Sequence, residues 1–322
     1  MPDVTLEARG LRKAYGRVVA VEELSFGVSA GEVLGLLGPN GAGKTTAIRV
    51  LTTIFPPSGG TFAVAGIPHT RPAEIRQRIG VLPESAGYPE QQTGMEFLRY
   101  YARLFGHSRE SARSIASTLL AEVGLAERGS SRIAVYSRGM RQRLGLARAL
   151  VNDPAVVFFD EPTLGLDPAG QRQVLRLVAD IARDRGATVV LSTHFLAEVE
   201  ETCSRVLILN RGRVVTEGTV AEVTRLAGAP RRGRFRVPAE HAERALETLA
   251  RVPGVDETQP LDSRPDWLTV TFGEASGSEA ATRERLISEA VRALSDAGVP
   301  ILAFELEGAR LSDAFLAMTE GG

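Results

Sequence analysis

The stretch Gly38–Thr46 reads GPNGAGKTT and directly follows an apolar run, EVLGLL at residues 32–37. It fits a phosphate-binding pattern in which glycines let backbone N–H groups close around phosphate oxygens, and the following helix contributes its positive N-terminal end. Of the 38 basic residues, only Lys13 and Lys44 are lysines, and all the others are arginines. A compact ammonium can enter a closed phosphate loop, whereas a planar guanidinium is bulkier. The stretch therefore predicts a nucleoside triphosphate site.

Each residue of this loop has an expected part in binding the triphosphate. Lys44 should reach the β- and γ-phosphates, and the Thr45 hydroxyl should coordinate Mg²⁺. The other residues expected to contact the nucleotide are Gly38, Pro39, Asn40, Gly41, Ala42, Gly43 and Thr46.

An acidic pair, Asp160 and Glu161, follows a second apolar run in the segment AVVFFDEP. A parallel sheet presents its ligand-binding groups at the carboxyl ends of its strands. We expect Asp160 to join the Mg²⁺ shell and Glu161 to orient the water that attacks the γ-phosphorus. Without the phosphate loop, the same pair could equally be two solvated carboxylates in a turn.

Length and composition limit the classes of protein to which the chain can belong. Its 322 residues suffice for two compact domains, with 43% hydrophobic residues, 24% charged residues and a net charge of -1. This nearly balanced charge argues against a nucleic-acid partner. The single cysteine, Cys203, excludes an intrachain disulfide, and no apolar run approaches the length of a membrane span. We expect a cytoplasmic protein.

The order of the segments predicts an α/β fold with a largely parallel sheet. Strand candidates alternate with amphipathic stretches, and a helical insert is expected at about residues 90–150. The segment LILNRGRVVT predicts a hairpin that turns at residues 210–212. The strand candidates are VTLEARGL, EVLGLLG, RIGVLPE, AVVFFDEP and TVVLSTH.

A second domain is expected after a linker rich in Gly, Pro and Arg. We place the boundary between residues 228 and 229, so that residues 229–322 form a separate α+β unit. Its segments read strand, helix, weak strand, strand, helix and strand, with Leu286, Ala290 and Leu294 on one helical face. This order is typical of a small ferredoxin-like domain.

The segment YSRGMRQRLGLARALVNDP, just before the acidic pair, makes the chain resemble the ATP-binding cassette of ABC transporters over about residues 4–223. The resemblance implies a P-loop NTPase fold with a mixed, largely parallel core sheet, an antiparallel β subdomain and a helical insert. It also implies that ATP is the nucleotide. Its further nucleotide-binding positions are Tyr15, which would stack on adenine, the signature residues Ser137, Gly139 and Met140, and Asp167 of the D-loop.

The resemblance also implies a mechanism and partners. Two cassettes would meet head to tail, as a homodimer or beside another cassette, with ATP between the phosphate loop of one and the signature residues of the other. Glu161 would be the general base, and His194 would contact the γ-phosphate. Transport would need a separate integral-membrane permease, which places this chain on the inner face of the cell membrane.

The segments LPESAGYPE, YSRGMRQR and LSDAFLAMT, together with the additional C-terminal domain, resemble the daunorubicin-resistance type of drug and antibiotic exporters. This resemblance favours the export of a drug-like, antibiotic or lipid-like substrate. An importer ATPase and a non-transport ABC ATPase are the alternatives. The C-terminal domain could regulate the ATPase by binding a ligand, or pack against a second copy as a dimerisation module.

Two of the expected contacts have plain structural alternatives. Glu84 stands where the family usually has a glutamine, and it could contact Mg²⁺, turn to solvent or pair with an arginine. Tyr15 could pack in the fold instead of stacking on a base.

Overall fold

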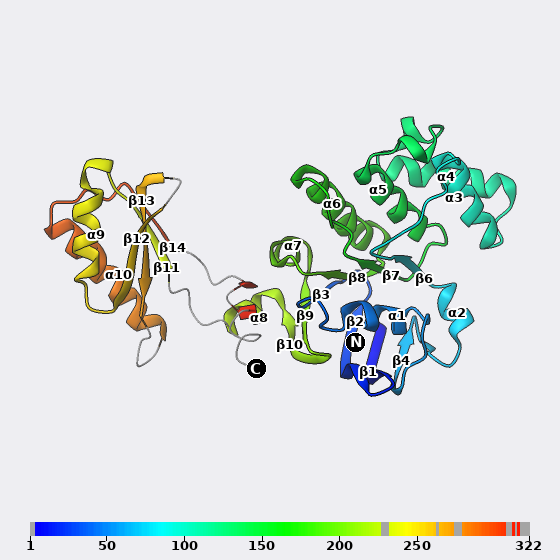
Figure 1. The fold of residues 1–322 in the computed structure, drawn as a ribbon, viewed down its shortest axis with the longest axis horizontal. Helices are drawn as coiled ribbons and strands as arrows, with labels where there is room; N and C mark the ends of the chain where they lie inside the picture. The colour runs from blue at the N-terminus through cyan, green and yellow to red at the C-terminus, as the bar shows by residue number, and fades with distance from the viewer. Residues whose placement is uncertain are drawn as a thin grey trace. The chain divides into compact units, whose positions relative to one another are not determined.

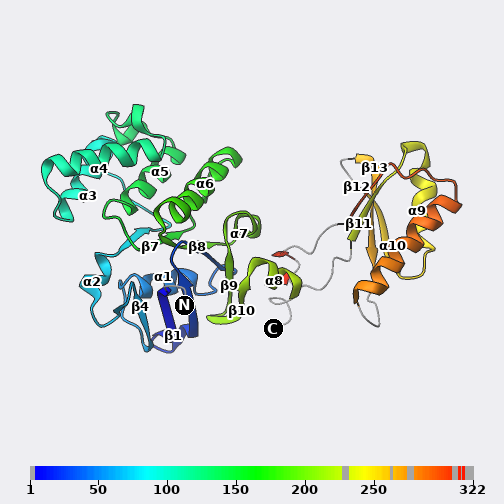
Figure 2. The same ribbon diagram turned by 180° about the vertical axis from the view of Figure 1, so that it is seen from behind.

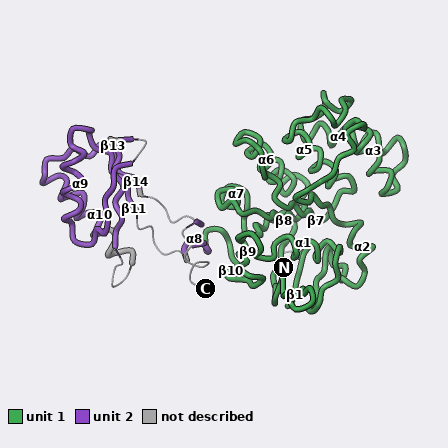
Figure 3. Tube along the Cα trace, in the orientation of Figure 1, with its two compact units in different colours: residues 1–221 green, residues 222–322 purple. Residues whose placement is uncertain are grey.

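The computed structural model describes residues 4–226, 232–261, 264–273, 279–306, 311–312 and 314–315. The chain divides into two compact units, residues 1–221 and 222–322 (Figure 3). The boundary that we expect between residues 228 and 229 lies outside the described residues and stays a prediction.

Unit 1 is built on a six-stranded sheet, and the expected largely parallel sheet is confirmed. Five of its strands run parallel and the last, β10, pairs antiparallel with β9 in the expected hairpin. The turn of this hairpin is formed by Arg211 and Gly212. In spatial order the strands are β10 (Arg213–Thr219), β9 (Arg205–Asn210), β3 (Val33–Leu37), β8 (Thr188–Thr193), β7 (Val156–Asp160) and β6 (Ile79–Leu82).

Helices cover both faces of this sheet, as a buried parallel sheet requires. All five residues of β3 and of β7 are buried, which explains their unbroken apolar sequences. Helix α1 (Lys44–Leu51) lies on one face, whereas α5 (Arg138–Ala149) and α6 (Pro168–Arg185) lie on the other (Figures 1 and 2). Shorter helices of unit 1 are α2 (Pro72–Arg76) and α7 (Leu196–Thr202), whereas α8 (Val220–Leu226) crosses the boundary between the two units.

A second, antiparallel sheet packs beyond α1, and the main core of unit 1 lies between the two sheets. Its strand order is β2–β1–β4–β5. Leu11 of β1, Leu24 of β2, Ile48 of α1 and Phe158 of β7 belong to one buried apolar cluster, so α1 is enclosed on both sides. The strands are β1 (Val4–Tyr15), β2 (Val18–Ser29), β4 (Gly59–Val64) and β5 (Ile67–Pro68).

The expected helical insert is present between β6 and β7. Its first two helices, α3 (Gly94–Leu104) and α4 (Arg109–Glu122), are followed by the short 3-10 turns η1 (Ala126–Arg128) and η2 (Ile133–Val135), and then by α5. Thr93 begins α3 through a reciprocal capping box: its hydroxyl accepts from the Glu96 N–H, and the Glu96 carboxylate accepts from the Thr93 N–H.

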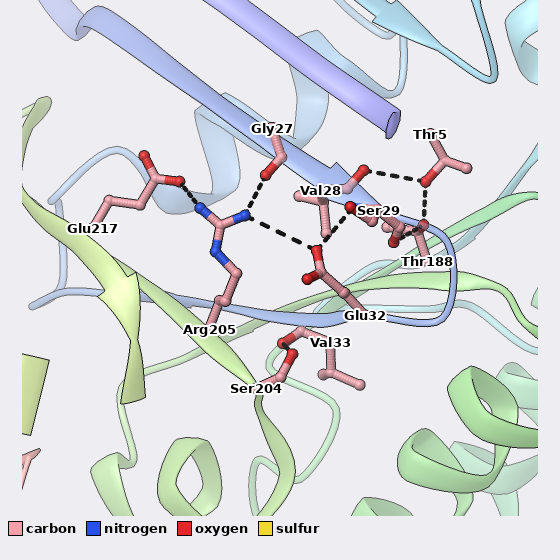
Figure 4. A network of polar contacts seen from close by, with 10 residues as sticks. All are labelled: Thr5, Gly27, Val28, Ser29, Glu32, Val33, Thr188, Ser204, Arg205 and Glu217. Carbon is pink, nitrogen blue, oxygen red and sulfur yellow. Dashed lines mark hydrogen bonds and ion pairs between the residues drawn. The ribbon is translucent and has the colours of Figure 1, made fainter. Parts of the chain in front are cut away.

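A polar network joins the two sheets of unit 1 (Figure 4). The Arg205 guanidinium donates to the Gly27 carbonyl at 2.6 Å and pairs with Glu32 at 3.9 Å. The Glu32 carboxylate accepts from the Ser29 N–H at 2.8 Å, and the Thr188 hydroxyl donates to the Ser29 carbonyl at 2.8 Å. Arg205 and Thr188 begin β9 and β8, so the network lies at the amino-terminal edge of the parallel strands. Its other members are Thr5, Val28, Val33, Ser204 and Glu217.

Unit 2 has the expected ferredoxin-like order of strands and helices. Its antiparallel sheet runs β12–β13–β11–β14. The helices pack on the sheet through a cluster that includes Phe235, Leu249, Val270 and Leu294. In chain order the elements are β11 (Arg232–Arg236), η3 (Ala239–His241), α9 (Ala242–Ala250), β12 (Val255–Leu261), β13 (Arg264–Phe272), α10 (Glu279–Asp296) and β14 (Ala303–Leu306).

Candidate functional site: a phosphate loop beside a carboxylate–histidine pair

The loop between β3 and α1 closes tightly at its carboxyl end. Gly43 has φ 105°, and a β-carbon there would come within 2.4 Å of the Ala20 carbonyl oxygen, so a side chain is excluded. No side chain caps α1, whose first residue is Lys44. The first N–H groups of α1 are thereby left available to an anion, together with the positive end of the helix dipole.

The Lys44 ammonium is held by carbonyls of its own loop. It is only 6% exposed and donates to the Gly38 oxygen at 2.7 Å and the Pro39 oxygen at 3.3 Å. Glu161 Oε1 lies 3.8 Å away. Burial lowers the pKa of Lys44, and the charges of Glu161, Asp160 and Glu84 partly oppose this. Phosphate oxygens would favour the charged ammonium further.

Asp160 and Glu161 stand at the carboxyl end of β7, as the sequence predicts. Glu161 has φ 50°, an uncommon value for a side-chain-bearing residue, and its N–H donates to the Ser192 carbonyl at 2.9 Å. This backbone directs the side chain to His194, whose Nδ1 lies 2.9 Å from Glu161 Oε2. The carboxylate therefore contacts both the histidine and, at a longer distance, Lys44.

The environment of the Asp160 side chain makes it a candidate Mg²⁺ ligand. Its side chain is buried, and in the part of the chain that the structure describes its Oδ1 has no hydrogen-bond partner. A buried carboxylate oxygen without a partner is costly unless a cation or another donor satisfies it. A carboxylate oxygen and the hydroxyl of Thr45, which lines the cleft, are the kinds of donor that a hard cation such as Mg²⁺ takes.

One cleft of about 520 Å³ brings most of the expected residues together. Glu84 lies on its wall, and no ion pair of Glu84 with an arginine is found among the described residues. The residues that line the cleft do not include Gly38, Pro39, Asp160 or Tyr15. The cleft is lined by Ala20, Asn40, Gly41, Ala42, Gly43, Lys44, Thr45, Thr46, Glu84, Glu161, Leu164 and His194.

Tyr15 ends β1 and is 43% exposed. Its ring packs edge to face on Phe55, with 5.9 Å between centroids, and the Lys13 ammonium lies 5.1 Å from its centroid. The structure thus places Tyr15 on a small aromatic and cationic cluster outside the cleft lining.

The signature residues lie at a second hollow of about 390 Å³. Ser137 caps α5 by accepting from the Met140 N–H at 3.2 Å, and Asp167 caps α6 by accepting from the Gly170 N–H at 3.2 Å. Ser137, Gly139 and Asp167 line this hollow, which has no lining residue in common with the cleft. In one copy of the chain the signature residues and the phosphate loop therefore line two separate hollows.

Two side chains near the candidate site, those of Arg138 and Glu198, were not predicted from the sequence. The Arg138 guanidinium covers Gly165, where a β-carbon would lie 2.3 Å from Arg138 Cζ. Glu198 is buried on α7, and its Oε2 accepts from the Thr193 hydroxyl at 2.8 Å. Thr193 Oγ1 in turn accepts from the N–H of Phe195 at 3.0 Å, so Glu198 supports the turn that carries His194. Burial raises the pKa of Glu198. The signal in the sequence that could have identified Glu198 is its position four residues after His194.

Comparisons with known proteins agree with this geometry. Residues 21–164 match the family model described as ABC transporter. The chain is 36% identical, over 99% of its length and 96% of the relative, to the daunorubicin resistance ATP-binding protein DrrA2 of Streptomyces coeruleorubidus. It is 41% identical to the Nod factor export ATP-binding protein I of Paraburkholderia xenovorans, over 68% of this chain and 72% of that protein. A solved ATP-binding subunit of an ABC transporter superposes with a TM-score of 0.62 at 33% identity, covering 70% of this chain and 93% of the other.

Proposed function

Because the chain belongs to the ATP-binding subunits of ABC transporters, we propose that it hydrolyses ATP to power the export of a drug-like, antibiotic or lipid-like substrate through a separate membrane permease. The names of its relatives, which refer to drug resistance and to Nod factor export, support export rather than import. The observation that carries the ATPase proposal is the convergence of the phosphate loop, Lys44 and the Glu161–His194 pair on one cleft.

In this proposal the triphosphate lies along the loop and the first turn of α1. Lys44 exchanges the Gly38 and Pro39 carbonyls for β- and γ-phosphate oxygens, and backbone N–H groups of residues 40–41 and 43–46 surround the chain of phosphates. Thr45, Asp160 and Glu84 would hold Mg²⁺, which neutralises charge on the phosphates when it is bound.

Glu161 is the proposed general base. Its carboxylate takes a proton from the attacking water as the water oxygen bonds to the γ-phosphorus, and the bond from that phosphorus to the ADP oxygen breaks. His194 holds the carboxylate through the 2.9 Å contact and lies on the cleft wall, where it would contact the γ-phosphate. ADP and phosphate are the products.

A second copy of the chain completes the site in this proposal. In this proposal Ser137, Gly139, Met140 and Asp167 act on a nucleotide held by another cassette. The signature hollow supports this arrangement because it shares no lining residue with the cleft. A head-to-tail homodimer meets this requirement with one kind of chain. Tyr15 would stack on the adenine of the ATP held by its own phosphate loop.

The membrane step is assigned to a separate permease. Within the described residues, no helix is both long and apolar enough to cross a membrane. The chain would be a cytoplasmic subunit bound to the permease at the inner face of the cell membrane. Residues 1–228 would form the cassette, and residues 229–322 a domain for dimerisation or regulation; no nucleic-acid partner is proposed.

Transport by inside-out membrane vesicles tests this proposal. The chain is expressed with the membrane protein that co-purifies with it in detergent, and uptake of a fluorescent amphipathic drug is followed with ATP and Mg²⁺. Export predicts ATP-dependent accumulation inside the vesicles, and vesicles carrying Lys44→Ala should show none. ATP-dependent loss of preloaded drug from the vesicles would contradict the proposed direction.

A further inference from the structure

Lys13, the other of the two lysines in the chain, has no part in the phosphate chemistry described above. It lies in β1 and is only 9% exposed. Its ammonium donates to the Pro56 carbonyl at 2.9 Å and lies 5.1 Å from the ring centroid of Tyr15 and 5.5 Å from that of Phe55. A buried cation thus contacts two aromatic rings and one carbonyl.

This cluster connects the end of β1 to the loop that leaves α1. The Ala14 N–H donates to the Ser58 hydroxyl at 3.1 Å, and the Ser58 N–H donates to the Arg12 carbonyl at 2.8 Å. The Phe55 N–H donates to the carbonyl of Arg49 in α1 at 3.2 Å. Helix α1 begins at the phosphate loop. These hydrogen bonds therefore connect the end of β1, where Tyr15 lies, through α1 to the backbone of that loop.

The contacts restrain the Tyr15 ring without burying it. A cation near an aromatic ring is attracted by the negative face of the ring, and the attraction is stronger where water is excluded. Phe55 meets the Tyr15 ring at an interplanar angle of 87°. Tyr15 nevertheless remains 43% exposed, which leaves ring surface for a further partner.

We propose that Lys13 is a positioning residue for adenine recognition: it fixes the Tyr15 ring, relative to the phosphate loop, in the orientation in which the ring stacks on the base. This inference rests on the proposed function, in which Tyr15 stacks on adenine. Ordering the ring before binding reduces the entropy lost when the base stacks. Lys13 therefore contributes to the binding of ligands that carry a base and not to the binding of phosphates alone.

A lysine suits this position better than an arginine. The Pro56 carbonyl offers one acceptor to a small ammonium flanked by two rings, whereas a guanidinium brings five N–H donors in a rigid plane. The arginine-rich composition of the chain makes the lysine notable here, as it does at Lys44.

Binding of two ligands to the full-length chain tests the inference. Isothermal titration with Mg²⁺ compares a non-hydrolysable ATP analogue, which carries adenine, with inorganic tripolyphosphate, which does not. Lys13→Met keeps a side chain of similar length and should weaken binding of the analogue by about five- to tenfold, which corresponds to the cost of ordering one side chain on binding. Tripolyphosphate binding should stay within about twofold, which also shows that the phosphate loop is folded.

Arg17→Met is the matched control, because it removes one positive charge from an exposed residue in the turn after Tyr15. It should leave both affinities within about twofold. Equal weakening of both ligands by Lys13→Met would overturn the inference in favour of a charge or folding effect, and unchanged affinity for the analogue would also overturn it.

Tyr15→Ala separates the inference from the proposed function. If this variant loses the preference for the analogue over tripolyphosphate while Lys13→Met retains it, Tyr15 stacks on the base and Lys13 does not position it. If the unmodified chain shows no such preference, or Tyr15→Ala keeps it, the stacking role of Tyr15 fails and the inference fails with it.

Discussion

Replacing Glu161 with glutamine should separate ATP hydrolysis from ATP binding. The substitution keeps the shape of the side chain and removes its negative charge and its capacity to accept a proton. The backbone at φ 50° is equally demanding for either residue, so the substitution adds no new backbone strain. An amide can still contact His194 Nδ1, at 2.9 Å from the present carboxylate, so the turn that carries the histidine should keep its place.

The expected magnitude follows from what the carboxylate contacts. Without ATP, the Gly38 and Pro39 carbonyls still hold the Lys44 ammonium in the loop after the Glu161 oxygen at 3.8 Å is lost, so Lys44 stays in place to receive the phosphates and ATP affinity should not fall. It should rise, because one negative charge beside the phosphates is removed. Loss of a general base lowers the rate by about 10²–10⁴-fold, equivalent to about 3–5 kcal/mol in the activation barrier.

Phosphate release gives the rate, and size-exclusion chromatography with ATP and Mg²⁺ gives the assembly state. The variant should hydrolyse ATP at least about a hundredfold more slowly and elute as a dimer that the unmodified chain loses on turnover. Glu74→Gln, which removes an exposed carboxylate paired with Arg71, is the control and should behave like the unmodified chain. Hydrolysis by Glu161→Gln within about tenfold of the unmodified rate would refute the assignment of Glu161 as the base.

Three further predictions concern the loop, the metal and the second unit. Lys44→Arg keeps the charge but puts a larger group at a site that is 6% exposed; ATPase activity should fall about a hundredfold, and activity within a few-fold of normal would argue against the phosphate loop. Glu84→Gln should tighten Mg²⁺-free ATP binding and retain hydrolysis, measured by nucleotide titration with and without EDTA. Identical Mg²⁺ dependence in the two proteins would place Glu84 outside the metal shell. Removing the chain from Gly233 onward should leave a soluble, ATP-binding cassette, because the two units have separate apolar clusters; an insoluble product without ATP binding would indicate a shared core.

The parallel sheet and the phosphate loop could be predicted because their signals are local. The apolar runs of β3 and β7 mark strands buried on both faces, and the glycine pattern with Lys44 lies in one contiguous stretch. Strand β2 was not identified from its residues, although Leu24, Phe26 and Val28 alternate as in a half-buried strand. The residues of β2 before Leu24 pair with β1 through register shifts, so the alternation expected of a regular strand is interrupted there.

The contacts that the sequence could not predict join residues far apart in the chain. Lys13 contacts Phe55 and Pro56, and Arg138 covers Gly165, but no short pattern of residues encodes either pair. The Glu161–His194 distance likewise depends on the pairing of β7 with β8, which brings residues 33 positions apart to one edge of the sheet. Motifs therefore predicted the candidate side chains, and strand pairing decided which of them meet.

The network around Arg205 joins the two sheets of unit 1 at the edge where β8 and β9 begin, whereas Glu161 and His194 follow the opposite, carboxyl edge of the parallel sheet. The side chains that join the sheets and those of the candidate site therefore have no position in common. Substitutions at one edge should leave the side chains of the other edge in place, so the two edges can diverge independently.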